Sequence, residues 1–205
     1  MLFFAAVIGF IFLTKTFSLR LVEKENIAFL NAYSNELGLF SLEKSAEEFP
    51  NSSLFHIYKS GCQHLSKLLQ GKGASNEEKR LGPEAMNAFR TALEKGFIDE
   101  SKKLNTWIVL FMLGISGGPL IGLVGTVWGV MNTFAAMAKA GEANIMVIAP
   151  GIASALTGTL CGLIVGIPAL FIYNFLSVRI RNILVEMTVF IDQFSHKVTD
   201  MYGGN

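Results

Sequence analysis

The stretch LNTWIVLFMLGISGGPLIGLVGTVWGVMNTFAAMA, residues 104–138, contains no charged residue. Residues 143–178, ANIMVIAPGIASALTGTLCGLIVGIPALFIYNFLSV, form a second such stretch, and only Lys139 to Glu142 separates the two. A helix needs about 20 apolar residues to cross the hydrocarbon of a bilayer, so each stretch is long enough to span it. We therefore predict two membrane-spanning helices at 104–138 and 143–178, joined by a short link at 139–142.

A third apolar segment begins the chain. Met1–Thr14 is short for a span, but Thr16, Phe17 and Ser18 can lengthen it past Lys15, whose long side chain can reach the interface. The segment has neither a basic region before its apolar run nor an A-x-A site after it, which favours a signal anchor over a cleaved signal peptide. Together with a mean hydropathy of +0.46, this predicts an all-α, multi-pass membrane protein with three transmembrane helices, the first at 1–19.

The orientation follows from the basic residues near the spans. They occur in three pairs, namely Lys15 and Arg20, Lys102 and Lys103, and Arg179 and Arg181. The link at 139–142 carries one positive and one negative residue. All three pairs fall on the cytoplasmic side if the N-terminus lies outside. The segments 20–103 and 179–205 are then cytoplasmic, and the link is periplasmic.

The cytoplasmic segments have the pattern of long helical extensions. Leu19–Tyr33 continues the first helix, Leu54–Leu69 carries an apolar stripe at helical spacing, and Ala85–Leu104 is expected to run into the second span. The tail, Ile180–Thr199, is amphipathic. Such a helix needs a partner helix, from its own chain or from a neighbouring subunit.

Other function classes find no support in the sequence. A formal net charge of +1 offers no footprint for nucleic acid. His56, Cys62 and His64 are close together, but their loose spacing is more typical of structural residues than of a metal site. No cofactor fingerprint and no nucleophile–base set is visible, so we expect neither a cofactor nor an enzyme. Cys62 and Cys161 are expected to be reduced, one cytoplasmic and one in the membrane.

Small residues form a stripe on each of the two long spans. On the second span the steps of 4, 4, 3 and 4 join Gly118, Gly122, Thr126, Gly129 and Thr133. On the third span the steps of 4, 4, 3, 4 and 3 join Gly151, Ala155, Thr159, Gly162, Gly166 and Ala169. Each set shares one helical face. Close packing of helices explains such stripes most simply, and lining of a lumen is the alternative for Gly122, Gly129, Ala155, Gly162 and Gly166.

The threonines of these stripes are expected at similar depth. Thr126 lies 13 residues before Lys139, and Thr159 lies 17 after Glu142. At ~1.5 Å per residue the two hydroxyls then differ by roughly 6 Å in height, near the middle of the membrane. Thr157 points about 200° away from Thr159. With Ser154 and Cys161 it forms a second, weaker polar face suited to contact a neighbouring helix.

The two long spans contain no Asp, Glu, Lys, Arg or His, although a membrane protein that moves ions alone is expected to keep an ionisable group inside the bilayer. Either this chain moves nothing, or a partner supplies the charge. A threonine inside a membrane can also simply donate to the carbonyl of residue i−4 and do nothing else.

Several motifs occur in an order that resembles the MotA/TolQ/ExbB family. They are GTVWGVMN at 125–132, APGIA at 149–153, Thr159, IPA at 167–169 and YN at 173–174. The resemblance covers about 115–176 closely, and it is nearest to ExbB, with TolQ next. One departure is Ser154, where ExbB and TolQ usually place a glutamate, and another is Gly117-Gly118-Pro119 before the glycine–threonine motif.

The resemblance implies a homo-oligomer, a pentamer, in the lipid of a bacterial inner membrane. In that family the ring surrounds transmembrane helices of an ExbD- or TolR-like single-span partner, whose aspartate carries protons. The ring converts proton-motive force into motion passed to TonB or TolA, and an ExbB-like subunit thereby energises TonB-dependent outer-membrane transport. Thr126 and Thr159 match the lumen-facing threonines and would contact the partner's carboxylate.

Other functions stay open beside this one. A TolQ-like subunit would serve envelope integrity. The absent glutamate at Ser154 also allows a non-conducting membrane scaffold whose glycine faces only pack helices. A flagellar-type stator fits the sequence less well, because the cytoplasmic segment is short and the motif around Trp128 is less typical of stators.

Overall fold

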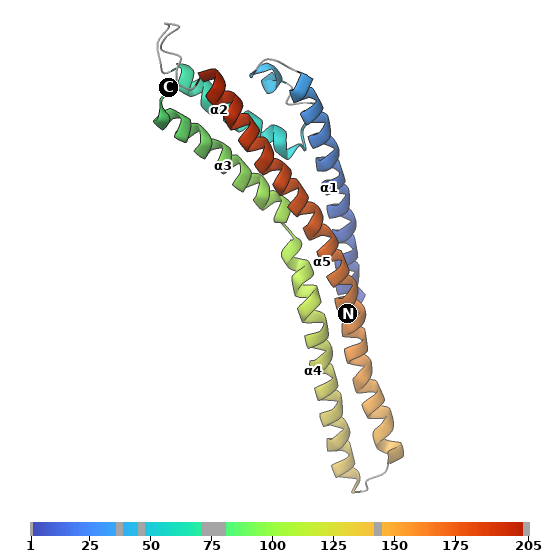
Figure 1. The fold of residues 1–205 in the computed structure, drawn as a ribbon. Helices are drawn as coiled ribbons and strands as arrows, with labels where there is room; N and C mark the ends of the chain where they lie inside the picture. Colours follow the sequence, from blue (N-terminus) through green and yellow to red (C-terminus); the bar gives the residue numbers. More distant parts are fainter. Residues whose placement is uncertain (1, 36–38, 45–47, 71–80, 142–144, 203–205) are drawn as a thin grey trace. The chain divides into compact units, whose positions relative to one another are not determined.

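The computed structural model describes residues 2–35, 39–44, 48–70, 81–141 and 145–202. Within these ranges the chain is helical and contains no β-strand (Figure 1). The helices are α1 (Leu2–Asn35), the short 3-10 helix η1 (Ser41–Lys44), α2 (Ser53–Gln70), α3 (Pro83–Asn105), α4 (Ile108–Ala140) and α5 (Ile145–Tyr202). The all-α class expected from the sequence is thus confirmed.

The chain forms two compact units. The apolar unit comprises Met1–Lys15 and Trp107–Val178, and the polar unit comprises Thr16–Thr106 and Arg179–Asn205. Both α1 and α5 are continuous helices that contribute residues to each unit. The limits expected at 19 and 178 therefore fall inside unbroken helices, as a membrane helix with a polar extension requires.

Aromatic side chains dominate the core of the polar unit. Phe29 of α1 lies 5.5 Å from Phe190 of α5 and 5.6 Å from Tyr58 of α2, measured between ring centroids. Phe194 of α5 lies 5.4 Å from Tyr58 and 5.6 Å from Phe89 of α3. These contacts bury the apolar stripes of four helices against one another. The partner that the amphipathic tail requires is therefore found within its own chain.

Hydrogen bonds fix the entrance to α2. Ser52 Oγ accepts from the Phe55 backbone N–H at 3.1 Å and donates to Asn26 Oδ1 at 2.9 Å. Asn51 donates to the Glu25 carboxylate through its backbone N–H at 2.6 Å and its side-chain amide at 2.8 Å. The helix thus begins with a serine cap that is also tied to α1.

The passage from α3 to α4 differs from the expectation. A single helix was expected to run through Ala85–Leu104 into the second span, but α3 ends at Asn105 and α4 begins at Ile108. Trp107 between them has φ +72°, in the left-handed region. Thr106 Oγ1 donates to the Lys102 carbonyl at 2.9 Å, and Asn105 Nδ2 donates to the Ser101 carbonyl at 2.9 Å. The same kind of bond to the i−4 carbonyl occurs within continuous helices, for example at Thr157, so the helix end here rests on the left-handed Trp107.

The far end of α4 also extends beyond the expected limit. Lys139 and Ala140 are helical, and Gly141, with φ +72°, ends the helix by donating its N–H to the Met137 carbonyl at 3.2 Å. Glycine suits this left-handed cap because it has no Cβ. Of the link expected at 139–142, residue 142 lies outside the described residues.

Among the residues that the structure describes, two helical stretches are long and apolar enough to cross a membrane. One lies within Pro83–Lys139, which includes the turn at Trp107, and the other within Ile148–Tyr202. These correspond to the second and third spans expected from the sequence. Many large apolar side chains of the apolar unit are exposed, among them Val124 at 68%, Ile164 at 61% and Leu156 at 59%. Surface of this kind requires lipid or protein to cover it.

Candidate functional site

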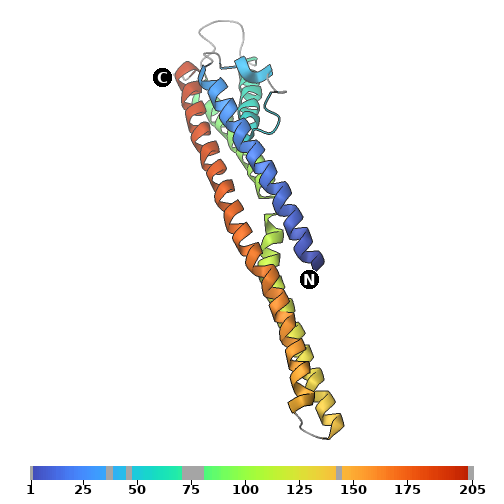
Figure 2. The same ribbon diagram turned by 90° about the vertical axis from the view of Figure 1, so that its right-hand side faces the viewer.

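Helices α4 and α5 approach closely along their small residues. A Cβ built on Gly118 would lie 2.9 Å from the Gly162 carbonyl oxygen, and one on Gly122 would lie 2.8 Å from the Gly158 carbonyl oxygen. Farther along, a Cβ on Gly129 would lie 2.6 Å from Ala155 Cβ. The contacts run in opposite directions along the two sequences, so the helices are antiparallel, as Figures 1 and 2 show. Backbone contact of this kind is possible only because nothing projects between the helices.

The two threonines of the stripes meet at this contact. Thr159 Oγ1 of α5 donates to Thr126 Oγ1 of α4 at 3.4 Å, and Thr126 Oγ1 in turn donates to the Leu123 carbonyl at 2.7 Å. Both residues are partly buried. Their proximity agrees with the similar depth derived from the sequence. The structure therefore places two hydroxyls in a short hydrogen-bonded chain between α4 and α5.

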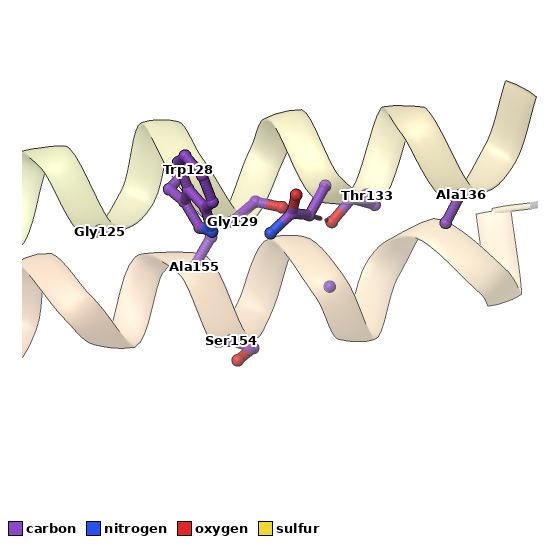
Figure 3. A pocket seen from close by; sticks show the side chains of 9 residues that line it. Gly125, Trp128, Gly129, Thr133, Ala136, Ser154 and Ala155 are labelled. Atoms are coloured by element: carbon purple, nitrogen blue, oxygen red, sulfur yellow. Dashed lines mark hydrogen bonds between the residues drawn. The ribbon is translucent and has the colours of Figure 1, made fainter.

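A groove of about 430 Å³ lies beside this contact, and we call it the Trp128 groove (Figure 3). Its lining consists of Gly125, Trp128, Gly129, Asn132, Thr133, Ala136, Gly151, Ser154 and Ala155. The Trp128 side chain is 66% exposed, and Thr133 Oγ1 donates to the Gly129 carbonyl at 2.8 Å. An indole, an amide and a hydroxyl thus share a groove that is otherwise lined by small residues.

A second groove of about 400 Å³ involves the weaker polar face, and we call it the Thr157 groove. It is lined by Ile121, Gly122, Ser154, Thr157, Gly158 and Cys161. Thr157 Oγ1 donates back to the Ala153 carbonyl of its own helix at 3.0 Å. Ser154 lines both grooves, and Figure 3 shows its side chain directed away from α4.

The residues singled out in the sequence divide into two groups. Gly122, Gly129, Ala155, Gly162 and Gly166 lie where α4 and α5 touch, with a Cβ on Gly166 reaching 3.0 Å from Pro119 Cδ. Ser154 and Thr157 lie instead on the side of α5 that opens to the Thr157 groove. The glycines thus pack helices within one chain. Their role in lining a lumen stays a prediction, as does the proton role of Thr126 and Thr159.

Six lining residues of the Trp128 groove were not expected as site residues, namely Gly125, Trp128, Asn132, Thr133, Ala136 and Gly151. Asn132 and Ala136 belong to it together with Gly125 and Gly129. Steps of 4, 3 and 4 join Gly125, Gly129, Asn132 and Ala136 in the sequence, so a search for a second small-residue face could have found them.

The chemistry open to this region is hydrogen bonding without proton exchange of its own. Between Trp107 and Val178 the only charged residues of the sequence are Lys139 and Glu142. Lys139, which the structure describes, lines neither groove. Threonine and serine hydroxyls can donate to a carboxylate or accept from a carboxylic acid, and an asparagine amide can do both. The region can therefore stabilise either form of a titrating group supplied by another molecule.

The sequence profile of the MotA/TolQ/ExbB proton channel family matches residues 56–189, which include α4, both grooves and most of α5. The chain belongs to the MotA/TolQ/ExbB proton channel family. The family that the motifs suggested is thus confirmed. The two threonines and Ser154 all lie within the matched region.

Individual relatives of this proton channel family carry two different names. The Tol-Pal system protein TolQ of Pseudomonas aeruginosa is 31% identical over 86% of this chain and 75% of its own length. TolQ of Haemophilus influenzae is 37% identical over 68% of this chain and 58% of its length. The biopolymer transport protein ExbB of Pseudomonas putida is 41% identical over 49% of this chain and 30% of its length. The chain is thus similar to both kinds.

Proposed function

We propose that this chain is an ExbB-like subunit of a motor in the bacterial inner membrane that is driven by proton-motive force. In this proposal several copies, five by family resemblance, surround the single transmembrane helix of an ExbD-like partner. The partner's aspartate carries the proton, and the motion energises TonB-dependent transport across the outer membrane. The chain crosses the membrane three times, with its C-terminus in the cytoplasm.

The hydrogen-bonded pair of Thr126 and Thr159 supports this proposal most directly. One hydrogen bond joins the two hydroxyls, from Thr159 to Thr126. A carboxylate on the partner's helix could take the place of either threonine in this hydrogen bond. A carboxyl group in apolar surroundings has a raised pKa, which lets it carry a proton at neutral pH. A threonine hydroxyl can accept a hydrogen bond from the protonated carboxyl group or donate one to the ionised form, and would thus stabilise both forms.

A TolQ-like role in envelope integrity is the second candidate. It is favoured by the two TolQ relatives, because their similarity extends over 86% and 68% of this chain. The two candidates share the ring, the proton and the lumen, and differ in the partner and in the protein that receives the motion. Complementation of strains lacking either system would separate them.

A non-conducting scaffold is the third candidate. It is favoured by the glycines, because Gly118, Gly122 and Gly129 all pack against α5 of the same chain. A scaffold of this kind predicts that the function of the complex does not depend on the partner's aspartate. Restoration of gradient-coupled transport by this chain only when the partner's aspartate is intact would rule it out.

The direct test removes both hydroxyls. The double variant Thr126→Val and Thr159→Val keeps the shapes of the side chains but can neither donate nor accept. Co-reconstituted with its cognate partner, it should lower proton flux about 10- to 100-fold, because hydrogen bonds to charged groups contribute about 1.5–3 kcal/mol each. Transport coupling in cells should fall with it.

The matched control is Ser116→Ala on α4. Its hydroxyl donates to the Met112 carbonyl at 3.0 Å and lines neither groove. This variant should leave flux unchanged. If the threonine double variant assembles with the partner and retains both flux and coupling, the role assigned to the pair is wrong.

A further inference from the structure

Glu100 is the one buried carboxylate among the residues that the structure describes. Its exposed fraction is 6%. It lies on α3, five residues before the last residue of that helix, Asn105. A carboxylate in such a place is stable only if partners compensate it.

Its partners come from two helices. His56 Nδ1 of α2 lies 3.2 Å from Glu100 Oε1, and Lys103 Nζ of α3 lies 2.5 Å from the same oxygen. The Lys103 side chain is 65% exposed. The His56 Nδ1 atom is buried and makes no hydrogen bond of good geometry in this structure, so its contact with Glu100 is an electrostatic one at 3.2 Å. Of the two, only His56 joins Glu100 to a different helix.

The ionised form of Glu100 prevails near neutral pH. Burial by itself raises the pKa of this carboxyl, but the hydrogen bonds and charges of His56 and Lys103 outweigh burial and hold the pKa below its usual value. A buried carboxylate that stays ionised attracts a protonated imidazole strongly. It binds a neutral imidazole more weakly, through one N–H alone.

We propose that His56 and Glu100 form a proton-dependent latch between α2 and α3, tight when His56 is protonated and looser when it is neutral. Histidine is the side chain whose ordinary titration falls between pH 5 and 8. The latch therefore tightens as the surrounding solution becomes acidic and loosens as it becomes alkaline. It is independent of the proposed motor function, and only its location in the cytoplasm rests on that proposal.

Other charged groups near these helices have their own partners. Glu23 of α1 pairs with Arg179 of α5 at 3.5 Å, and Glu25 of α1 accepts from Asn51. Arg90 of α3 lies 3.9 Å from Asp192 of α5. The groups adjoining the latch in sequence are Lys59 on α2 and Asp99, Lys102 and Lys103 on α3. Of the side-chain types in this cluster, imidazole is the one that ordinarily changes charge between pH 6 and 8.

Hydrogen exchange of the full chain in lipid nanodiscs tests the latch. Exchange rates are measured at pH 6 and pH 8 for the amides of residues 56–60 and 99–104, and each rate is divided by its intrinsic rate at that pH. The wild type should show about five-fold greater protection at pH 6, since a charge-assisted bond exceeds a neutral one by about 1 kcal/mol. His56→Gln should show equal protection at both values.

The chain provides its own control histidine. His196 on α5 is exposed, so His196→Gln should keep the five-fold difference. Equal protection of the wild type at the two pH values would overturn the latch without any variant. So would a His56→Gln or Glu100→Gln protein that retains the full difference. If His56→Gln does not fold, the wild type, His196→Gln and Glu100→Gln still decide the matter.

Discussion

Gly122 and Gly117 lie on the same helix, yet their surroundings are opposite. A Cβ on Gly122 would lie 2.8 Å from the Gly158 carbonyl oxygen and 2.9 Å from Thr159 Cα, whereas a Cβ on Gly117 would meet nothing within 4 Å. The atoms near Gly122 belong to the backbone of α5. They cannot move aside by a rotamer change, so the helices themselves would have to separate.

We therefore expect Gly122→Ala to destabilise the protein by about 1–3 kcal/mol, the usual cost of overpacking. It should also reduce proton flux, because Thr126 and Thr159 lie on the two helices that it pushes apart. Gly117→Ala should be neutral, or stabilise by up to about 1 kcal/mol through helix propensity. Thermal unfolding of both variants in one detergent measures the difference. Equal melting temperatures would show that α4 and α5 do not pack as described.

The threonine pair and the latch illustrate what a sequence reveals about single residues. Similar depth of Thr126 and Thr159 followed from counting residues to the link, because the rise of a helix is constant. The contact of His56 with Glu100 could not be derived in this way, since it depends on how α2 and α3 pack. Asn132 of the Trp128 groove is an intermediate case, because its helical face could be read from the sequence but its place beside α5 could not.

Among the elements, α2 shows how one residue can serve two helices. Ser52 caps α2 through the Phe55 N–H and also donates to Asn26 of α1, whose side chain is fully buried. The Leu54 backbone N–H also donates to Asn26 Oδ1, at 3.4 Å. Loss of the Ser52 hydroxyl would thus affect the helix end and a buried amide at once.

Ser52→Ala should lower the free energy of unfolding by about 1–3 kcal/mol, which combines a lost cap with a weakened buried hydrogen bond. Ser66→Ala on the same helix is the control, because its exposed hydroxyl only donates to the Gln63 carbonyl at 3.0 Å. The measurement is thermal unfolding followed by the helical circular dichroism signal. A Ser52 variant as stable as the Ser66 variant would contradict the capping role.

Helix periodicity predicted most of the helices but missed the break between α3 and α4. The stripe from Leu54 to Leu69 fell within α2, and the helix expected to continue beyond Leu19 does so as far as Asn35. The break between α3 and α4 was missed because Trp107 adopts a left-handed conformation that tryptophan rarely takes. Apolar spacing carries no sign of such a turn.

For the whole molecule, the distribution of basic residues and of exposed apolar surface determines which parts can enter a membrane. The exposed side chains of Val124, Ile164 and Phe171 belong to the apolar unit, and Phe171 alone is 70% exposed. The pairs Lys102 and Lys103, and Arg179 and Arg181, all belong to the polar unit. Positive charge near the ends of spans retains those ends in the cytoplasm. The polar unit and the C-terminus should therefore share one compartment.

Reporter fusions in cells test this orientation. Green fluorescent protein after Asn205 should fluoresce, and alkaline phosphatase inserted after Gly141 should be active, since it folds only in the periplasm. The exchanged fusions serve as controls. Green fluorescent protein after Gly141 should not fluoresce, and alkaline phosphatase after Asn205 should be inactive. Alkaline phosphatase at the N-terminus adds a test of the first span, because it is active only if α1 crosses the membrane. Activity at Asn205 with fluorescence at Gly141 would reverse the orientation and place the His56 latch in the periplasm.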